Sequence, residues 1–314
     1  MLVSVLSQLA VMFLMIGAGY LVRRVNIVSE KCQSDLAEVV LWIALPCSIV
    51  ESGVLETASN STSSILWMTG LSLLSYILVI LAAEGIARLF PMPERRRGLF
   101  ACMTVFANTA FVGYPVCNLL LGSKGVFYCS FFNMAFSLFF FTYGVRRISG
   151  KRENGMLAVF TRDPGMIATV LMLLIFACQW KPPAFVQTFL SGMSALCTPL
   201  SMLVIGCMLT QVNLKDILKE KSYYLLSFIR LTAIPVCTLL ILLPLARLGV
   251  DKDILFIVII MCAMPAGSLT AIYAQKYRKD AHYVSGGIMH TMVCFCISLP
   301  IIILLSQWML YGGM

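Results

Sequence analysis

Two stretches of the chain combine polar and helix-weakening residues inside hydrophobic runs. They are "VFANTAFVGYPVCNLLLG", residues 105–122, and "MCAMPAGSLTAIYA", residues 261–274. Proline removes a backbone donor and glycine lowers helix propensity, so each stretch predicts a pair of half-helices instead of one continuous helix. Half-helix N-termini present amide groups that favour anions, and C-termini present carbonyl oxygens that can hold a cation. These residue types favour a binding site for a small charged molecule.

Polar side chains beside the two prolines are the candidates for direct contact with a ligand. They are Asn108 and Thr109 in the first stretch, and Ser268 and Thr270 in the second. Hydroxyl and amide groups would supply hydrogen bonds, and the prolines would mark the helix breaks. The alternative is that Asn108 only joins neighbouring helices and that the prolines only kink them.

Few ionisable residues lie deep inside the hydrophobic segments. Arg230 could extend its side chain to the interface, or it could line a vestibule that attracts anions. His290 could titrate during gating or coupling, or it could be a hydrogen-bonded residue of the helical bundle. Glu84 and Arg88 are four residues apart, which favours a local ion pair. No Asp or Glu is expected at mid-depth, so a cation site there would have to use carbonyls, hydroxyls and amides.

The elements that must position these residues are membrane-spanning helices. Of the 314 residues, 60% are hydrophobic and 12% are charged, and the mean hydropathy is +0.92. Such a composition is typical of an all-α polytopic membrane protein, with about 20 apolar residues for each span. Ten spans are predicted, near residues 2–22, 34–53, 64–89, 97–121, 124–146, 164–181, 184–210, 221–246, 253–275 and 281–309.

The net charge of +9 is explained by membrane topology and not by nucleic-acid binding. Eighteen of the 23 Lys and Arg residues fall in the odd-numbered loops between the predicted spans. By the positive-inside rule these loops face the cytoplasm, so both termini are expected on the outer side of the cell (plasma) inner membrane.

No pattern for a cofactor, a metal or catalysis accompanies the spans. Eleven of the twelve cysteines lie within predicted spans, which excludes a disulfide framework and offers no metal-ligand spacing. Nucleotide loops, zinc-protease motifs and a catalytic triad at one depth are absent from the sequence. We therefore expect neither an enzyme nor ATP-driven transport, and coupling to Na+ or H+ stays open.

Proline landmarks recur along the chain in the same order. Pro46 and Pro199 lie in the second and seventh spans, and Pro115 and Pro265 lie in the fourth and ninth. This order predicts a 5+5 inverted repeat, with residues 1–150 as the first half and 151–314 as the second. The second half would enter the membrane from the opposite side, because five is an odd number.

Several of these stretches resemble the auxin efflux carrier family, which includes the plant PIN proteins and compact bacterial organic-acid carriers. The similar stretches are "LPCSIVESG", "ANTAFVGYPVCNLLLGSKGVFYCSFFNMAF", "TPLSMLVIGCMLT" and "MPAGSLTAIYAQKY" followed by "DA". The resemblance implies an elevator-type carrier in which spans 1, 2, 6 and 7 form a scaffold that makes a homodimer. Spans 3–5 and 8–10 would form the transport unit, with Asn108, Pro115 and Pro265 where spans 4 and 9 cross. The resemblance further implies that the substrate-binding residues Thr109, Gly113, Ala266 and Ser268 lie beside the ligand.

The leading hypothesis is a secondary transporter that moves a small organic anion, a mono- or dicarboxylate or an auxin-like molecule, by elevator alternating access. Its partners would be that anion and the lipid bilayer. A sodium-coupled carrier of the bile-acid symporter type is the related alternative, although polar or acidic clusters expected for it are not seen. A membrane receptor or an intramembrane enzyme is the alternative from another class. The segment "MPAGSL" is richer in Met, Ser and Gly than many relatives, which leaves the substrate and the ion coupling open.

Overall fold

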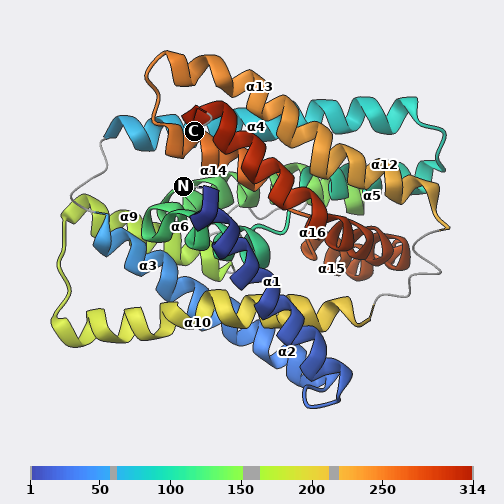
Figure 1. The fold of residues 1–314 in the computed structure, drawn as a ribbon. Coiled ribbons are helices and arrows are strands. Elements are labelled where there is room, and N and C mark those ends of the chain that lie inside the picture. Colours follow the sequence, from blue (N-terminus) through green and yellow to red (C-terminus); the bar gives the residue numbers. More distant parts are fainter. Residues whose placement is uncertain (1, 57–61, 151–162, 212–218, 313–314) are drawn as a thin grey trace. The chain divides into compact units, whose positions relative to one another are not determined.

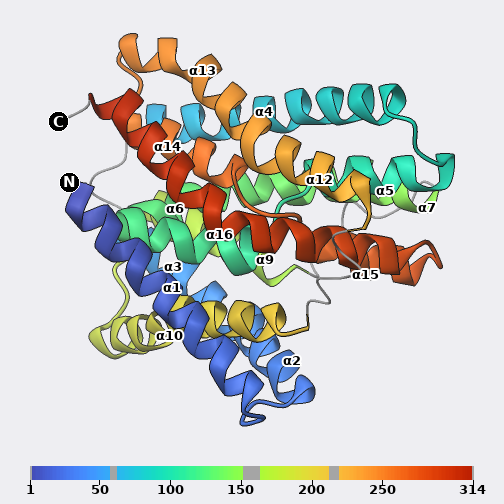
Figure 2. The same ribbon diagram turned by 45° about the vertical axis from the view of Figure 1, so that its right-hand side comes forward.

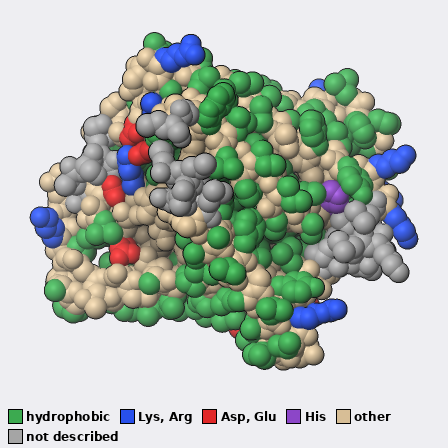
Figure 3. Space-filling model, viewed as in Figure 1, with side chains coloured by type: hydrophobic (Ala, Val, Ile, Leu, Met, Phe, Trp, Pro, Cys, Tyr) green, Lys and Arg blue, Asp and Glu red, His purple; other side chains and the backbone are tan. Residues whose placement is uncertain are grey.

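The computed structural model describes residues 2–56, 62–150, 163–211 and 219–312. Its secondary structure is helical throughout these ranges, apart from one isolated bridge between extended residues. Six helices there are long and apolar enough to cross a membrane, which confirms the predicted polytopic membrane protein. On the face drawn in Figure 3, hydrophobic side chains predominate and the Lys and Arg side chains lie near its margins. The start of the predicted second half, residues 151–162, falls outside the described ranges.

The chain divides into two compact units, and each is described by itself. Unit 1 comprises Met1–Ile65, Ala110–Met134 and Phe160–Val212, and unit 2 comprises Leu66–Thr109, Ala135–Val159 and Asn213–Met314. The helices of unit 1 are α1 (Leu2–Arg24), α2 (Glu30–Val39), α3 (Leu45–Leu55), the first part of α6 (Tyr114–Phe139), α9 (Pro164–Cys178) and α10 (Ala184–Leu209). The helices of unit 2 are most of α4 (Thr62–Leu89), then α5 (Glu94–Val105), the end of α6, α7 (Val145–Ser149), α12 (Lys221–Phe228), α13 (Ile234–Arg247), α14 (Lys252–Cys262), α15 (Leu269–Lys276) and α16 (Ala281–Tyr311).

Close helix packing in unit 1 depends on small residues. In Figures 1 and 2, α1 lies against α10, and the backbones approach each other at Gly19 and Gly206. A Cβ at Gly206 would collide with the carbonyl oxygen of Ile16, and one at Gly19 with that of Leu203. The Sγ of Cys207 donates to the Gly19 carbonyl oxygen over 3.2 Å. Small residues give two membrane helices close van der Waals contact, which drives their association in lipid.

In the described ranges four π-helical turns interrupt the long helices, and three of them end two residues before a proline. They are η1 (Val40–Ala44), η2 (Thr109–Gly113), η3 (Phe140–Gly144) and η4 (Ile229–Ala233). Pro46, Pro115 and Pro235 each occupy the second position of the α-helix that follows η1, η2 and η4. Proline has no N–H and its ring presses on the preceding turn, so the chain there adopts the wider π turn without a complete break.

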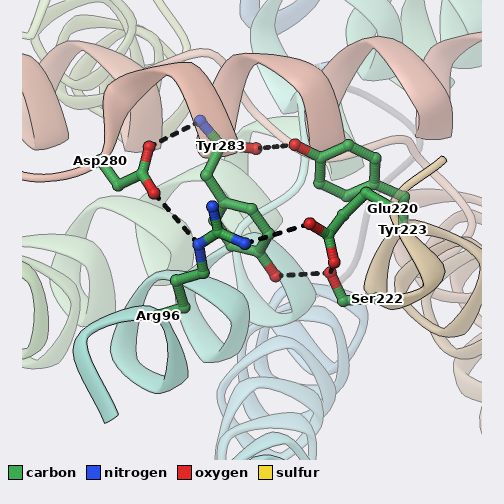
Figure 4. Close-up of polar contacts among 6 residues, drawn as sticks. All are labelled: Arg96, Glu220, Ser222, Tyr223, Asp280 and Tyr283. Carbon is green, nitrogen blue, oxygen red and sulfur yellow. Dashed lines mark hydrogen bonds and ion pairs between the residues drawn. The ribbon is translucent and has the colours of Figure 1, made fainter. Parts of the chain in front are cut away.

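The N-terminal ends of α5, α12 and α16 are tied together in unit 2 by the Arg96 cluster, which Figure 4 shows. Its members are Arg96, Glu220, Ser222, Tyr223, Asp280 and Tyr283. Arg96 donates through Nη1 to Glu220 over 3.0 Å and through Nε to Asp280 over 3.1 Å, and its guanidinium lies 4.4 Å from the centroid of the Tyr283 ring. One side chain thus joins the beginnings of three helices.

Glu84 forms its ion pair with Arg147 and not with Arg88, so the predicted local pair is wrong. The Nε of Arg147 donates to Glu84 over 2.6 Å, and the Tyr143 hydroxyl donates to the same carboxylate over 2.6 Å. Arg88 is exposed. Glu84 pairs with Arg147 of α7 and not with Arg88 of its own helix α4. The Arg147 guanidinium and the Tyr143 phenol together satisfy this partly buried carboxylate better than the exposed Arg88 would.

Candidate functional site

Two breaks in the helices of unit 2 meet and form a short backbone bridge. Helix α5 ends at Val105, and α14 ends at Cys262 before α15 begins at Leu269. Ala107 and Ala266 pair as an antiparallel bridge. The Asn108 N–H donates to the Pro265 carbonyl oxygen over 2.8 Å, and the Gly267 N–H donates to the Phe106 carbonyl oxygen over 2.9 Å. We call residues 106–108 and 263–268 the crossover.

The break after α5 lies upstream of the position that the sequence suggested. Phe106 is extended, with φ −95° and ψ 109°, whereas Pro115 lies within α6 and follows the π turn η2. Gly113 belongs to that π turn. Both residues belong to unit 1, and the crossover to unit 2. The expectation that Pro115 marks the break is therefore wrong, because proline is accommodated by a wider turn. Pro265, in contrast, lies inside the second break.

An aromatic cluster holds the extended residue Phe106 in place. Its ring packs against those of Tyr76, Phe136, Phe140 and Tyr143, with centroid separations from 4.9 to 6.4 Å. Phe106 itself is fully buried. Aromatic contacts of this kind add favourable energy beyond area burial, so tertiary packing stabilises an irregular backbone that no proline or glycine imposes at 106–108.

Close approach at the crossover requires glycine at position 267. A Cβ there would lie 2.7 Å from the Ala107 carbonyl oxygen and 3.3 Å from that of Phe106. These are backbone atoms, which cannot rotate away as a side chain can. Gly267 is not one of the residues that the sequence singled out for the site. Its position two residues after Pro265 could have indicated a close backbone approach, which glycine permits.

Arg230 binds two carbonyl groups at the end of α5 and one in the crossover just beyond α14. Its Nε donates to the Met264 carbonyl oxygen over 2.9 Å, and its Nη1 donates to those of Thr104 and Val105 over 3.0 and 3.3 Å. The side chain lies in η4 and is 2% exposed. The expectation that it extends to the interface is therefore wrong. A guanidinium has several fixed donors, so one residue can reach two helix ends at once.

The first residues of α15 include polar groups that have no hydrogen-bond partner in the described part of the chain. The Thr270 side chain is fully buried, and its Oγ1 has no hydrogen-bond partner in the described part of the chain. Ser268 precedes the helix and is half-buried. Neither the Ser268 N–H nor the Leu269 N–H donates to an acceptor within the described ranges. A buried hydroxyl and amides at a helix N-terminus can bind an anionic oxygen.

The other amides of the crossover are already engaged. The Ala266 N–H donates over 3.1 Å to the Oγ1 of Thr291, a residue of α16. The Asn108 and Gly267 amides form the bridge itself. Asn108 and Thr109 are buried, at 5% and 2% exposed. Of the candidates in unit 2, the structure thus brings together Asn108, Pro265 and Ala266, with Thr109, Ser268 and Thr270 adjacent along the chain.

His290 lies at the packing contact of α12 and α16. Its Nδ1 is 2.6 Å from the Ser227 Oγ, and its ring packs edge-on against Tyr224 with a centroid separation of 4.8 Å. Its neighbour Thr291 accepts the hydrogen bond from the Ala266 N–H of the crossover. The arrangement is that of a hydrogen-bonded histidine in a helical bundle, and a role in gating or coupling stays a prediction.

Known proteins with similar sequences are transporters. The family model described as membrane transport protein matches residues 4–159 and 156–303. An uncharacterized transporter of Methanothermobacter thermautotrophicus is 28% identical over 312 residues, which cover 95% of this chain and 96% of the relative. An uncharacterized transporter of Methanocaldococcus jannaschii is 22% identical over 289 residues, which cover 90% of this chain and 92% of the relative. The chain belongs to the membrane transport protein family, the auxin efflux carrier family that its motifs resemble, and is a multi-pass transporter embedded in the lipid bilayer.

Proposed function

We propose that this protein is a secondary transporter for a small organic anion, a mono- or dicarboxylate or an auxin-like molecule. The observation that carries the proposal is the start of α15, where the Thr270 hydroxyl is buried without a partner in the described part of the chain. Ser268 and the N-terminal amides of the helix lie within two residues of it along the chain. A carboxylate is an acceptor-only group, which fits this set of donors.

The charges around the crossover support an anion as the ligand. The negative carbonyl ends of α5 and α14 are covered by the guanidinium of Arg230. The N-terminal end of α15 keeps its partial positive charge. An anion that binds at α15 would therefore meet hydrogen-bond donors without repulsion from bare carbonyl groups. Asn108 and Thr109 would supply further polar contacts.

The movement that we propose is elevator alternating access within a 5+5 inverted repeat of ten spans. Spans 3–5 and 8–10 would move against a scaffold of spans 1, 2, 6 and 7, through which two copies form a homodimer. Two proline landmarks in matching order and the two meeting helix breaks support this architecture. The excess of Lys and Arg in the odd loops supports placement in the inner membrane with both termini outside.

The decisive experiment is uptake into proteoliposomes with a panel of mono- and dicarboxylates, under imposed sodium, proton or voltage gradients. We expect saturable uptake of at least one carboxylate. Transport of none under any gradient would contradict the proposal. The second candidate, a sodium-coupled carrier of the bile-acid type, predicts uptake that depends strictly on the sodium gradient.

Asn108 offers a direct test of the site. Asn108→Ala keeps the backbone N–H that bonds to Pro265, so the crossover should persist. We expect the variant to lose the thermal stabilisation that the transported carboxylate gives the wild type, while its circular dichroism stays unchanged. Unchanged stabilisation by the carboxylate would remove Asn108 from the site.

A further inference from the structure

We propose that the guanidinium of Arg230 is the resident cation of the crossover and takes the place that a coupling sodium ion would otherwise occupy. The inference rests on the proposed function only in what it says about transport, because the contacts of Arg230 are all within the protein. It assigns Arg230 as a positioning residue, which acts on the ligand through the two helix ends that it holds.

The first argument is the identity of the acceptors. All three contacts of Arg230 are backbone carbonyl oxygens, those of Thr104, Val105 and Met264. Carbonyl oxygens at broken helices are the groups that coordinate sodium in transporters built from such helices. Here the same kind of oxygen, contributed by both broken segments, accepts from a side chain of the protein itself.

The second argument is the balance of charge. The C-terminus of α5 carries roughly half a negative elementary charge, and the Met264 carbonyl oxygen beyond α14 adds a further partial negative charge, so these acceptors suit one positive guanidinium. No carboxylate completes the set, because Arg230 has no ion pair among the described residues. A sodium ion entering the same carbonyl groups would meet a fixed charge of its own sign in a buried, poorly screened place.

The third argument is the permanence of the charge. Arginine stays protonated under all physiological conditions, whereas a bound sodium ion exchanges with solvent. Helix ends that depend on sodium become ordered only when the ion binds, which is how ion binding and substrate binding are linked. With Arg230 in place the two ends are ordered at all times. Anion binding should then be indifferent to sodium.

The test compares cation responses in the purified wild type and in Arg230→Ala, without any anionic substrate. Thermal unfolding is measured in NaCl and in choline chloride at equal ionic strength, and ²²Na+ binding is measured at equilibrium. We expect the wild type to unfold at the same temperature in both salts and to bind no ²²Na+. Arg230→Ala should unfold at a lower temperature, and low millimolar guanidinium or sodium, but not choline, should restore part of the loss.

Two further variants separate charge from packing. Arg230→Lys keeps a positive charge that reaches fewer carbonyl groups, so we expect an intermediate unfolding temperature with the same indifference to sodium. Thr238→Val is the matched control, because Thr238 is in α13, close along the chain, and bonds to the Ile234 carbonyl oxygen and the Cys262 thiol but to none of the three carbonyl groups that Arg230 holds. It should show neither a sodium nor a guanidinium response. If Arg230→Ala gives no folded protein, the wild type and Arg230→Lys decide the question by their salt responses.

Saturable stabilisation of the wild type or of Arg230→Lys by sodium over choline would overturn the proposal, as would an Arg230→Ala protein that unfolds like the wild type and ignores both added cations. These outcomes are independent of the uptake experiment. Failure to move any carboxylate would contradict the proposed function and leave the cation result standing, whereas sodium binding by the wild type would contradict this inference and leave anion transport standing.

Discussion

The backbone N–H of Asn108 donates to the carbonyl oxygen of Pro265 over 2.8 Å, and this bond joins two helix breaks that lie far apart in the sequence. Its companion runs from Gly267 to Phe106, so the two segments are held by a pair of peptide hydrogen bonds. In a membrane protein, irregular backbone persists only where the protein or a wet cavity satisfies it. Here each break satisfies part of the other, and Arg230 satisfies the carbonyl groups of Thr104, Val105 and Met264.

Gly267→Ala should disrupt the crossover, because the added Cβ would meet the Ala107 carbonyl oxygen at 2.7 Å. We expect a loss of about 1–3 kcal/mol in stability, the usual cost of overpacking, and loss of carboxylate uptake. Gly85→Ala in α4 is the matched control, since no atom lies within 4 Å of a Cβ there. Thermal unfolding in detergent measures both. Equal unfolding temperatures for the two variants would contradict the role of Gly267.

Thr270→Val should reduce anion uptake while the fold is kept. The change replaces a buried hydroxyl that has no partner in the described part of the chain, so stability should hold or rise slightly. We expect the apparent KM for the carboxylate to rise about tenfold, the equivalent of one charge-assisted hydrogen bond of about 1.4 kcal/mol. Ser306→Ala removes another such hydroxyl, on α16, and should leave uptake unchanged. Similar kinetics for both variants would exclude Thr270 from the site.

Asp280→Asn should weaken the Arg96 cluster at neutral pH and have little effect at low pH. Partial burial by itself would raise the pKa of Asp280, but the hydrogen bonds from the Tyr283 N–H and from Arg96 lower it below the ordinary value of 3.8. A lowered pKa means that the carboxylate stabilises the fold above pH about 3.8, and that this contribution is lost as the pH falls through the folded-state pKa.

At pH 7 we expect the Asp280→Asn variant to be less stable than the wild type by about 1.5 kcal/mol, the lower end of the range for a hydrogen bond to a charged group, because Asp280 is partly exposed. Unfolding temperatures of both proteins, compared from pH 7 down to pH 3, should converge at the acid end. A difference that stays constant over this range would show that charge is not the cause.

Gly206→Leu should separate α1 from α10, since a Cβ at this position would collide with the Ile16 carbonyl oxygen. The expected cost is about 3 kcal/mol or more, because both partners at the contact are backbone. Gly192→Leu, on the same helix α10, has open space around its Cβ and serves as the control. We expect Gly206→Leu to unfold at a lower temperature and to be cleaved faster in limited proteolysis than Gly192→Leu.

The helical class and the approximate limits of the long helices follow from hydropathy, because about 20 apolar residues in succession have few other structures. The break between α14 and α15 can also be predicted from the sequence, since Pro265 and Gly267 mark it. The break at residues 106–108 cannot. Nothing local forbids a helix at residues 106–108, and the contacts that hold Phe106 extended come from residues distant in sequence, such as Tyr76 and Phe140.

The contacts of Arg230 could not be predicted from the sequence either. Its position shows only that a charged residue lies deep in a hydrophobic segment, where charged residues of membrane proteins are by default candidates for function. Its acceptors are backbone carbonyl oxygens, and these have no signature in the residue types. These acceptors come within reach of one side chain only because the segments that follow α5 and α14 meet in the fold.

The Ala107–Ala266 bridge has a consequence for how such a carrier can diversify. It is built from peptide groups, so it does not specify which side chains surround it, apart from the size limit at Gly267. Positions 108, 109, 268 and 270 can therefore vary without dismantling the frame. Under the proposed function, a few substitutions at these four positions would change which anion is bound while the peptide frame stays the same.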